Sequence, residues 1–139
     1  MLMERVIDFF KNMNLYDKDY FEKIKKRTTI YNKPYEEIKD FVGCYPIYKD
    51  KEIIDFKLIL PMINSVADEL IYVHEYSHAL FLKDKSEIFP NIMEAYFINL
   101  YIRNIEIKKE LLKNIQIQLE NTEDINHKIG IKIKLMNIK

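Results

Sequence analysis

The chain has 139 residues, enough for one domain with a substantial hydrophobic core. Its 22 basic and 22 acidic residues cancel and are mixed along the sequence, so we expect no nucleic-acid partner and no binding to a charged membrane surface. No apolar run approaches the roughly 18 residues that span a bilayer, and the charged start does not resemble a signal peptide. We therefore expect a soluble, cytoplasmic protein.

The first part of the chain, residues 1–43, is predicted to form three short helices. Apolar side chains recur at helical spacing over residues 2–13, and Asp17 can cap a second helix. Pro34 suits the first position of a third helix, which Gly43 can close. These helices precede the residues that carry candidate chemistry.

Residues 44–60 change to the two-residue period of strands. Segments 44–48 and 53–60 are joined by a polar turn and should form an antiparallel hairpin. The free edge of the second strand could hold an extended peptide beside a metal, and an ordinary half-buried strand fits equally well. Cys44, the only cysteine, is expected to be a buried structural thiol. The face of the second strand expected to be buried consists of Ile54, Phe56, Leu58 and Leu60.

The next helix carries the clearest motif in the sequence. Ser65 and Asp68 resemble a capping box, so the helix should begin near Ser65. His74, Glu75 and His78 then form an HExxH pattern, in which the two imidazoles share one helical face and can bind one metal ion. Zinc bound in this way lowers the pKa of water to about 7, and Glu75 could accept the proton. The alternative is that both histidines are satisfied core residues.

A third metal ligand is expected from a long helix over residues 90–120. If the two helices form an antiparallel hairpin that turns near Lys85, the middle of the histidine pair lies opposite Glu94. Glu87 is the alternative ligand, but this count places it on the order of 10 Å along the axis from the histidines. Other candidates on this helix, with plain packing as their alternative, are Asn91 as support for Glu94 and Tyr96 and Tyr101 as oxyanion stabilisers.

The final segment, residues 121–139, has two possible structures. As a strand, it alternates apolar and polar side chains and could pair with the hairpin; as a helix, it carries an apolar stripe of Ile125, Ile129, Ile133 and Met136. Either form could mask the cleft or complete the core. His127 is expected to face solvent, with an approach to the zinc or its oxyanion as the alternative.

Two stretches, HEYSHAL and the later MEAYF, resemble the gluzincin metallopeptidases. The resemblance implies zinc at His74, His78 and Glu94, with Glu75 as general base. Ser77 stands where a glycine is usual in the motif, and Ile98 replaces the Asp found in thermolysin relatives.

A wider span, from Gly43 to Tyr101, is similar to the core of the oligoendopeptidase F and thimet oligopeptidase family. The similarity rests on Gly43, Tyr45 and Asp68, and the segment around Glu87 resembles that family's glutamate-bearing segment. In size the chain is similar to the minigluzincins, which implies latency through a C-terminal segment that blocks the cleft.

Together these features predict an α+β, predominantly helical, zincin-like single domain with a small antiparallel sheet. Its parts would be helices in 1–43, a hairpin in 44–60, metal-site helices in 65–120 and the segment 121–139. The expected function is a zinc-dependent peptidase with one Zn²⁺ per chain, acting on a peptide or protein as a monomer or homodimer. Alternatives are a peptidase of the ImmA and IrrE type dedicated to one regulatory protein, and a metal-binding or interaction domain without catalysis.

Overall fold

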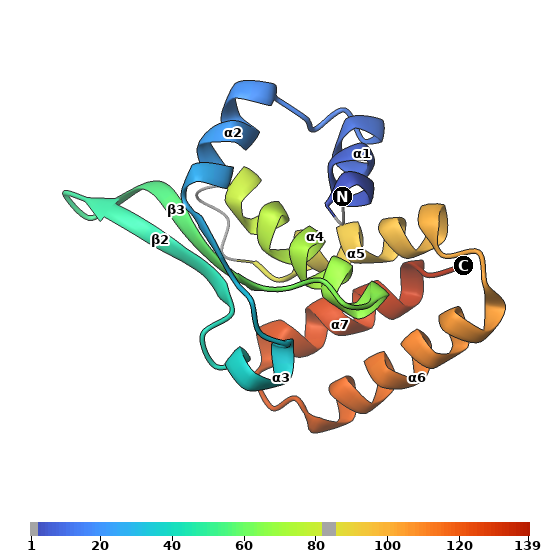
Figure 1. Cartoon of the computed structure of the whole chain (residues 1–139). Helices are drawn as coiled ribbons and strands as arrows, with labels where there is room; N and C mark the ends of the chain where they lie inside the picture. Colours follow the sequence, from blue (N-terminus) through green and yellow to red (C-terminus); the bar gives the residue numbers. More distant parts are fainter. Residues whose placement is uncertain (1–2, 82–85) are drawn as a thin grey trace. The chain divides into compact units, whose positions relative to one another are not determined.

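The computed structural model describes residues 3–81 and 86–139 (Figure 1). The chain forms two compact units, Met1–Asp84 and Lys85–Lys139. Within the described residues it is α+β, with seven helices and one three-stranded mixed sheet. None of the described helices has the length and apolar character needed to cross a membrane.

The first unit contains four helices and all three strands among its described residues. In chain order they are α1 (Glu4–Asn12), α2 (Lys18–Lys26), β1 (Thr28–Tyr31), α3 (Tyr35–Ile38), β2 (Gly43–Lys49), β3 (Glu52–Pro61) and α4 (Val66–Leu80).

The predicted N-terminal helices are confirmed, except that the third is only one turn long. Asp17 caps α2, since its Oδ1 accepts a hydrogen bond from the Tyr20 amide at 2.9 Å. Gly43 does not close α3 as predicted. It begins β2 and pairs with Ile59 of β3.

Strand β1 was not predicted, and it changes the role of the hairpin. The sheet order is β1-β3-β2, with β3 parallel to β1 and antiparallel to β2. The expected purely antiparallel sheet is therefore wrong. So is the free edge expected along residues 53–60, because Leu58 and the residues after it in β3 pair with both neighbouring strands. The signal for β1 was its β-branched and aromatic sequence, TTIY.

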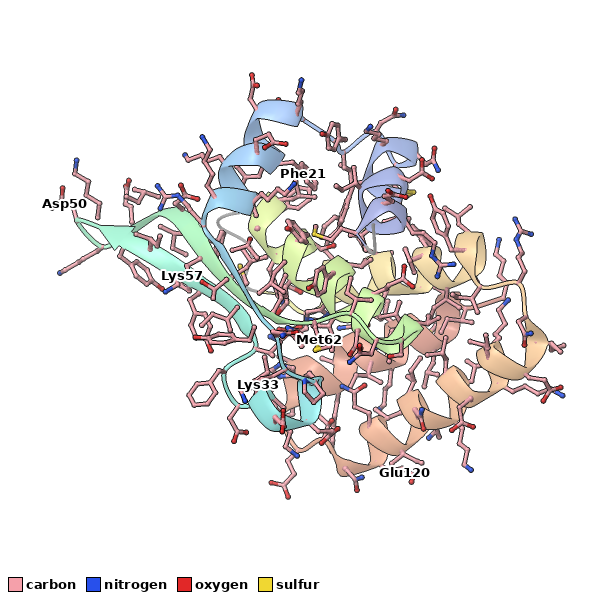
Figure 2. The ribbon with its side chains drawn as sticks, viewed as in Figure 1. Phe21, Lys33, Asp50, Lys57, Met62 and Glu120 are labelled. Atoms are coloured by element: carbon pink, nitrogen blue, oxygen red, sulfur yellow. The ribbon has the colours of Figure 1, made fainter. Side chains whose placement is uncertain are left out.

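The predicted hairpin of β2 and β3 is confirmed. Asp50 and Lys51 have φ of 52° and 69°, the left-handed conformation of a two-residue turn whose twist matches that of the strands. Asp50 lies at the tip of the hairpin (Figure 2).

A bulge interrupts the register of this hairpin and changes which side chains are buried. Ile47 pairs with Asp55 and Tyr48 with Ile53, so Ile54 is the extra residue of β3. Ile54 is consequently 48% exposed and does not share the buried face of Phe56, contrary to the prediction.

Asp55 is buried beside the bulge, and two cations of the preceding helix and its end neutralise it. Its Oδ2 lies 3.0 Å from Lys23 Nζ and 3.1 Å from Arg27 Nε. Burial opposes ionisation of Asp55, but the hydrogen bond from the Phe56 amide and the two cations hold its pKa below the ordinary value. The basic end of α2 thus has a partner within its own unit.

Helix α4 is held against both the sheet and α1. The Tyr72 hydroxyl donates to the Pro61 carbonyl at 2.6 Å, where β3 ends. The Tyr76 ring stacks on Phe21 of α2, with ring centroids 5.8 Å apart. Arg5 of α1 donates two hydrogen bonds, each of 2.9 Å, to the Glu69 carboxylate. These contacts fix the axial position of the motif helix within the first unit.

The second unit contains α5 (Ile88–Tyr101), α6 (Ile105–Asn121) and α7 (Ile125–Asn137). The single long helix predicted over residues 90–120 is wrong. Ile102 has extended backbone, and Asn104 caps α6 by accepting a hydrogen bond from the Ile107 amide at 3.0 Å. The strand alternative for the final segment is also wrong, because α7 is a helix capped by Asp124.

Helix α7 packs along α5 and runs in the same direction. At its C-terminal end, the Asn99 Nδ2 donates to the Asn137 carbonyl at 2.8 Å. Gly130 permits the close approach at the other end, since a Cβ there would lie 2.7 Å from the Glu87 carbonyl oxygen. The buried face contains Gly130, Ile131 and Lys134. The predicted stripe points elsewhere, with Ile125 and Met136 more than two-thirds exposed.

Candidate metal centre

The two motif histidines lie on one face of α4, as predicted. Helix capping sets their level: the Ser65 hydroxyl accepts from the Asp68 amide, and Asp68 Oδ2 accepts from the Asn64 amide at 2.8 Å. His74 and His78 follow one turn apart, with ring centroids 4.9 Å apart and both side chains half-buried. Partial exposure leaves the imidazoles reachable for an ion.

Glu75 is buried, 8% exposed, and its charge acts on two groups of the first unit. Burial and, second, the Glu75 charge raise the pKa of the Cys44 thiol on β2. Burial is also the main cause of the raised pKa of Tyr35, to which Glu36 and, more weakly, Glu75 contribute. Cys44 is thus a protonated, half-buried thiol, in keeping with the structural role expected for it.

Ser77 is fully buried between the two histidines in sequence. Its hydroxyl donates to the Val73 carbonyl, one turn earlier, at 2.6 Å. This bond satisfies the only polar group that serine adds relative to glycine. The small side chain is therefore accommodated at this position of the motif.

Glu87 is the N-cap residue of α5 and is buried, 8% exposed. His127 Nε2 lies 3.5 Å from Glu87 Oε1. The Asn91 side chain donates to the Glu87 carbonyl oxygen at 2.6 Å. Asn91 therefore supports the first turn of α5 at Glu87, rather than the Glu94 carboxylate that the sequence suggested.

Glu94 lies deeper in the second unit, where it has a cationic partner. The Lys134 Nζ of α7 donates to Glu94 Oε1 at 3.3 Å, and the two side chains are only 5% and 9% exposed. The Lys134 charge makes the Glu94 carboxylate a partner in a buried ion pair.

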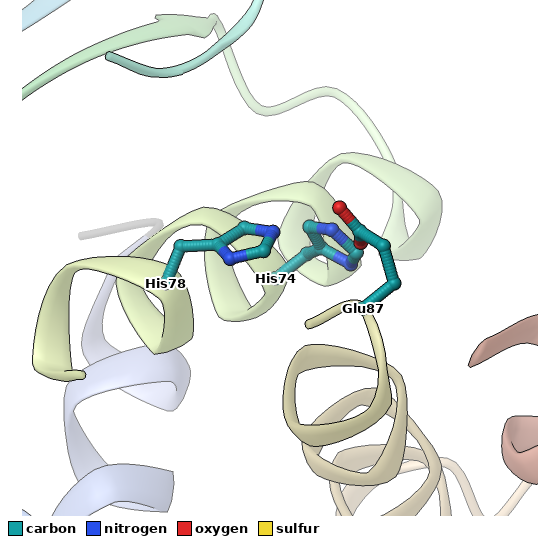
Figure 3. Close-up of side chains that lie close together, drawn as sticks. All are labelled: His74, His78 and Glu87. Atoms are coloured by element: carbon teal, nitrogen blue, oxygen red, sulfur yellow. The ribbon is translucent and has the colours of Figure 1, made fainter. Parts of the chain in front are cut away.

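Among the described residues, one group of side chains could hold a metal ion, and it consists of His74, His78 and Glu87 (Figure 3). Each offers one ligand atom, and these atoms all lie within 4.8 Å of one another. Glu94, the expected third ligand, is not in this group. Counting helical levels about a turn at Lys85 presupposes two antiparallel rods, and neither the crossing angle nor the partner of Glu94 is visible in such a count.

The tyrosines suggested as oxyanion stabilisers lie on the same helix as Glu94. Tyr96 is 37% exposed, and the Tyr101 ring stacks on Phe97 with centroids 4.9 Å apart. Sequence reasoning missed the neighbour of Glu87, His127, and the partner of Glu94, Lys134. A lysine within an otherwise apolar helix was the one available signal for the latter.

Searches of protein-family models, of curated proteins and of solved structures find no match to this chain.

Proposed function

We propose that the protein is a zinc-dependent peptidase in which His74, His78 and Glu87 bind the metal and Glu75 is the general base. The observation that carries the proposal is the group of two imidazoles and one carboxylate, gathered within 4.8 Å, with the motif glutamate adjacent to the first imidazole. This donor set is the one that catalytic zinc uses in hydrolases.

The residues fit zinc in both chemistry and spacing. Two neutral imidazoles and one carboxylate bind a borderline-soft dication and leave the net charge of the site at about +1. Ligand atoms of tetrahedral zinc lie roughly 3.3 Å apart at bond lengths of about 2.0 Å. Side-chain rotations of about an ångström bring atoms within 4.8 Å to that spacing.

Glu75 supplies the proton transfers of the proposed reaction. When bound, zinc lowers the pKa of a water molecule and polarises the scissile carbonyl. Glu75 accepts the proton that water loses as it attacks the carbonyl carbon. It then delivers this proton to the nitrogen of the departing amine, so that the C–N bond breaks and the carboxylate is ready for another cycle. Burial of Glu75 keeps this proton from exchanging with bulk water.

The ligand set is tested by zinc content per chain after dialysis against a weak chelator. We expect close to one zinc in the wild type, loss of most of it in Glu87→Gln, and retention in Glu94→Gln. The reverse order of the two variants would make Glu94 the third ligand. A wild type without zinc would refute the metal site, and with it the peptidase.

Catalysis is tested with Glu75→Gln, which should keep zinc and fold and lose hydrolysis of a peptide library by about 10²- to 10⁴-fold. Glu106→Gln on the exposed first turn of α6 is the matched control, expected to match the wild type. Equal activity in Glu75→Gln would rule out its role as base.

A further inference from the structure

The start of α7 places an imidazole between two carboxylates. Asp124 Oδ1 accepts a hydrogen bond from the His127 amide at 2.9 Å and lies 3.0 Å from His127 Nδ1. On the other side of the ring, His127 Nε2 lies 3.5 Å from Glu87 Oε1. The zinc ligands proposed above make no use of His127 or Asp124.

The protons of this arrangement can be assigned from donor chemistry. An ionised carboxylate only accepts hydrogen bonds, so the Nδ1 of His127 donates to Asp124. The Nε2 of the neutral ring then carries a lone pair beside a negatively charged oxygen of Glu87. Two such acceptors repel each other unless a positive charge lies between them. Their separation of 3.5 Å is close to the roughly 3.3 Å between two ligand atoms of tetrahedral zinc.

Packing of α7 on α5 fixes this position. At Gly130, one turn after His127, a Cβ would lie 2.7 Å from the Glu87 carbonyl oxygen and 3.0 Å from the Glu87 Cβ. The missing side chain lets the first turn of α7 lie directly against Glu87. Asp124 caps the same turn, so both the backbone and the ring of His127 are oriented by one carboxylate.

We propose that His127 Nε2 is a further ligand of the metal ion, next to Glu87, and that Asp124 fixes its tautomer. A metal-bound histidine commonly donates its other N–H to a carboxylate, which orients the ring and raises its basicity. This proposal rests on the zinc site proposed above. Zinc can expand to five ligands during hydrolysis, so binding of His127 and entry of water are compatible.

Nitrogen NMR of the histidine side chains tests the proposal, because the chain contains only three histidines. With ¹⁵N-labelled histidine, zinc should shift one ring nitrogen in each of the three imidazoles, and His127 should keep a protonated Nδ1. His127→Gln assigns the third set of signals. If only His74 and His78 respond, His127 is not a ligand and the zinc site stands. If none responds, the zinc site itself is refuted.

A conservative variant tests the part played by Asp124. Asp124→Asn keeps the helix cap, since asparagine caps helices as well as aspartate, but removes the carboxylate from the imidazole. The Kd for zinc, measured by competition with a chromophoric chelator, should rise about 10- to 100-fold with helicity unchanged. Asp50→Asn at the hairpin tip removes the same charge and should leave the Kd unchanged. A Kd within twofold of the wild type in Asp124→Asn would overturn the assigned role.

Discussion

The buried ion pair between Glu94 and Lys134 gives the sharpest prediction about stability. Lys134→Met preserves the aliphatic stem that packs in the second unit but leaves the Glu94 carboxylate without its printed cation. Because the two side chains are only 9% and 5% exposed, water cannot replace that cation, and we expect a loss of about 3–5 kcal/mol in the free energy of unfolding.

Removing both charges should recover much of this loss. In Lys134→Met combined with Glu94→Gln, the remaining penalty is that of a buried amide, about 1–3 kcal/mol. The double variant is therefore expected to be more stable than Lys134→Met alone. Strictly additive effects of the two substitutions would show that the pair is not energetically coupled.

Urea denaturation followed by circular dichroism measures both quantities. With a slope of about 2 kcal/mol per molar urea, a loss of 4 kcal/mol, the middle of the range of about 3–5, lowers the midpoint by about 2 M. Lys132→Met, on the exposed face of the same helix, is the matched control and should stay within about 0.5 kcal/mol of the wild type. A loss below about 1 kcal/mol in Lys134→Met would refute the reasoning, because it would mean that Glu94 is hydrated or fully compensated by other groups.

Three further predictions concern backbone approach, charge and the motif serine. Gly130→Ala should destabilise by about 1–3 kcal/mol in urea titrations, since overpacking against the Glu87 carbonyl outweighs the gain of about 1 kcal/mol in helix propensity; Gly43→Ala, whose Cβ meets atoms no closer than 3.7 Å, should not. The lowered pKa of Asp55 predicts stability that is present above the pKa of about 3.9 in the unfolded chain and is lost as pH falls through the lower folded value, so unfolding midpoints from pH 7 to pH 3 should fall less steeply in Asp55→Asn. Ser77→Leu should cost about 1–3 kcal/mol by calorimetry because the site is fully buried, whereas Ser77→Ala, which removes the donor but leaves the Val73 carbonyl in its helix, should cost about 1 kcal/mol or less.

The sequence by itself determined the features that depend on neighbours along the chain. The three predicted caps at Asp17, Ser65 and the start of the motif helix follow from side chains that bond amides three residues later. The hairpin and the shared face of His74 and His78 follow from the periods of strand and helix. In each case the interacting groups are within a few residues, so the local pattern contains the information.

Only the tertiary structure decided which distant groups meet. Strand β1 joins β3 across about 30 residues, and the pairing removes the edge that the sequence left free. Lys134 neutralises a carboxylate 40 residues earlier, which gives Glu94 a partner of its own and leaves Glu87 as the acid grouped with the histidines. A local pattern fixes the direction of a side chain on its own helix, but the helix packing that brings two side chains together depends on the whole core, and a single glycine at position 130 is enough to set it.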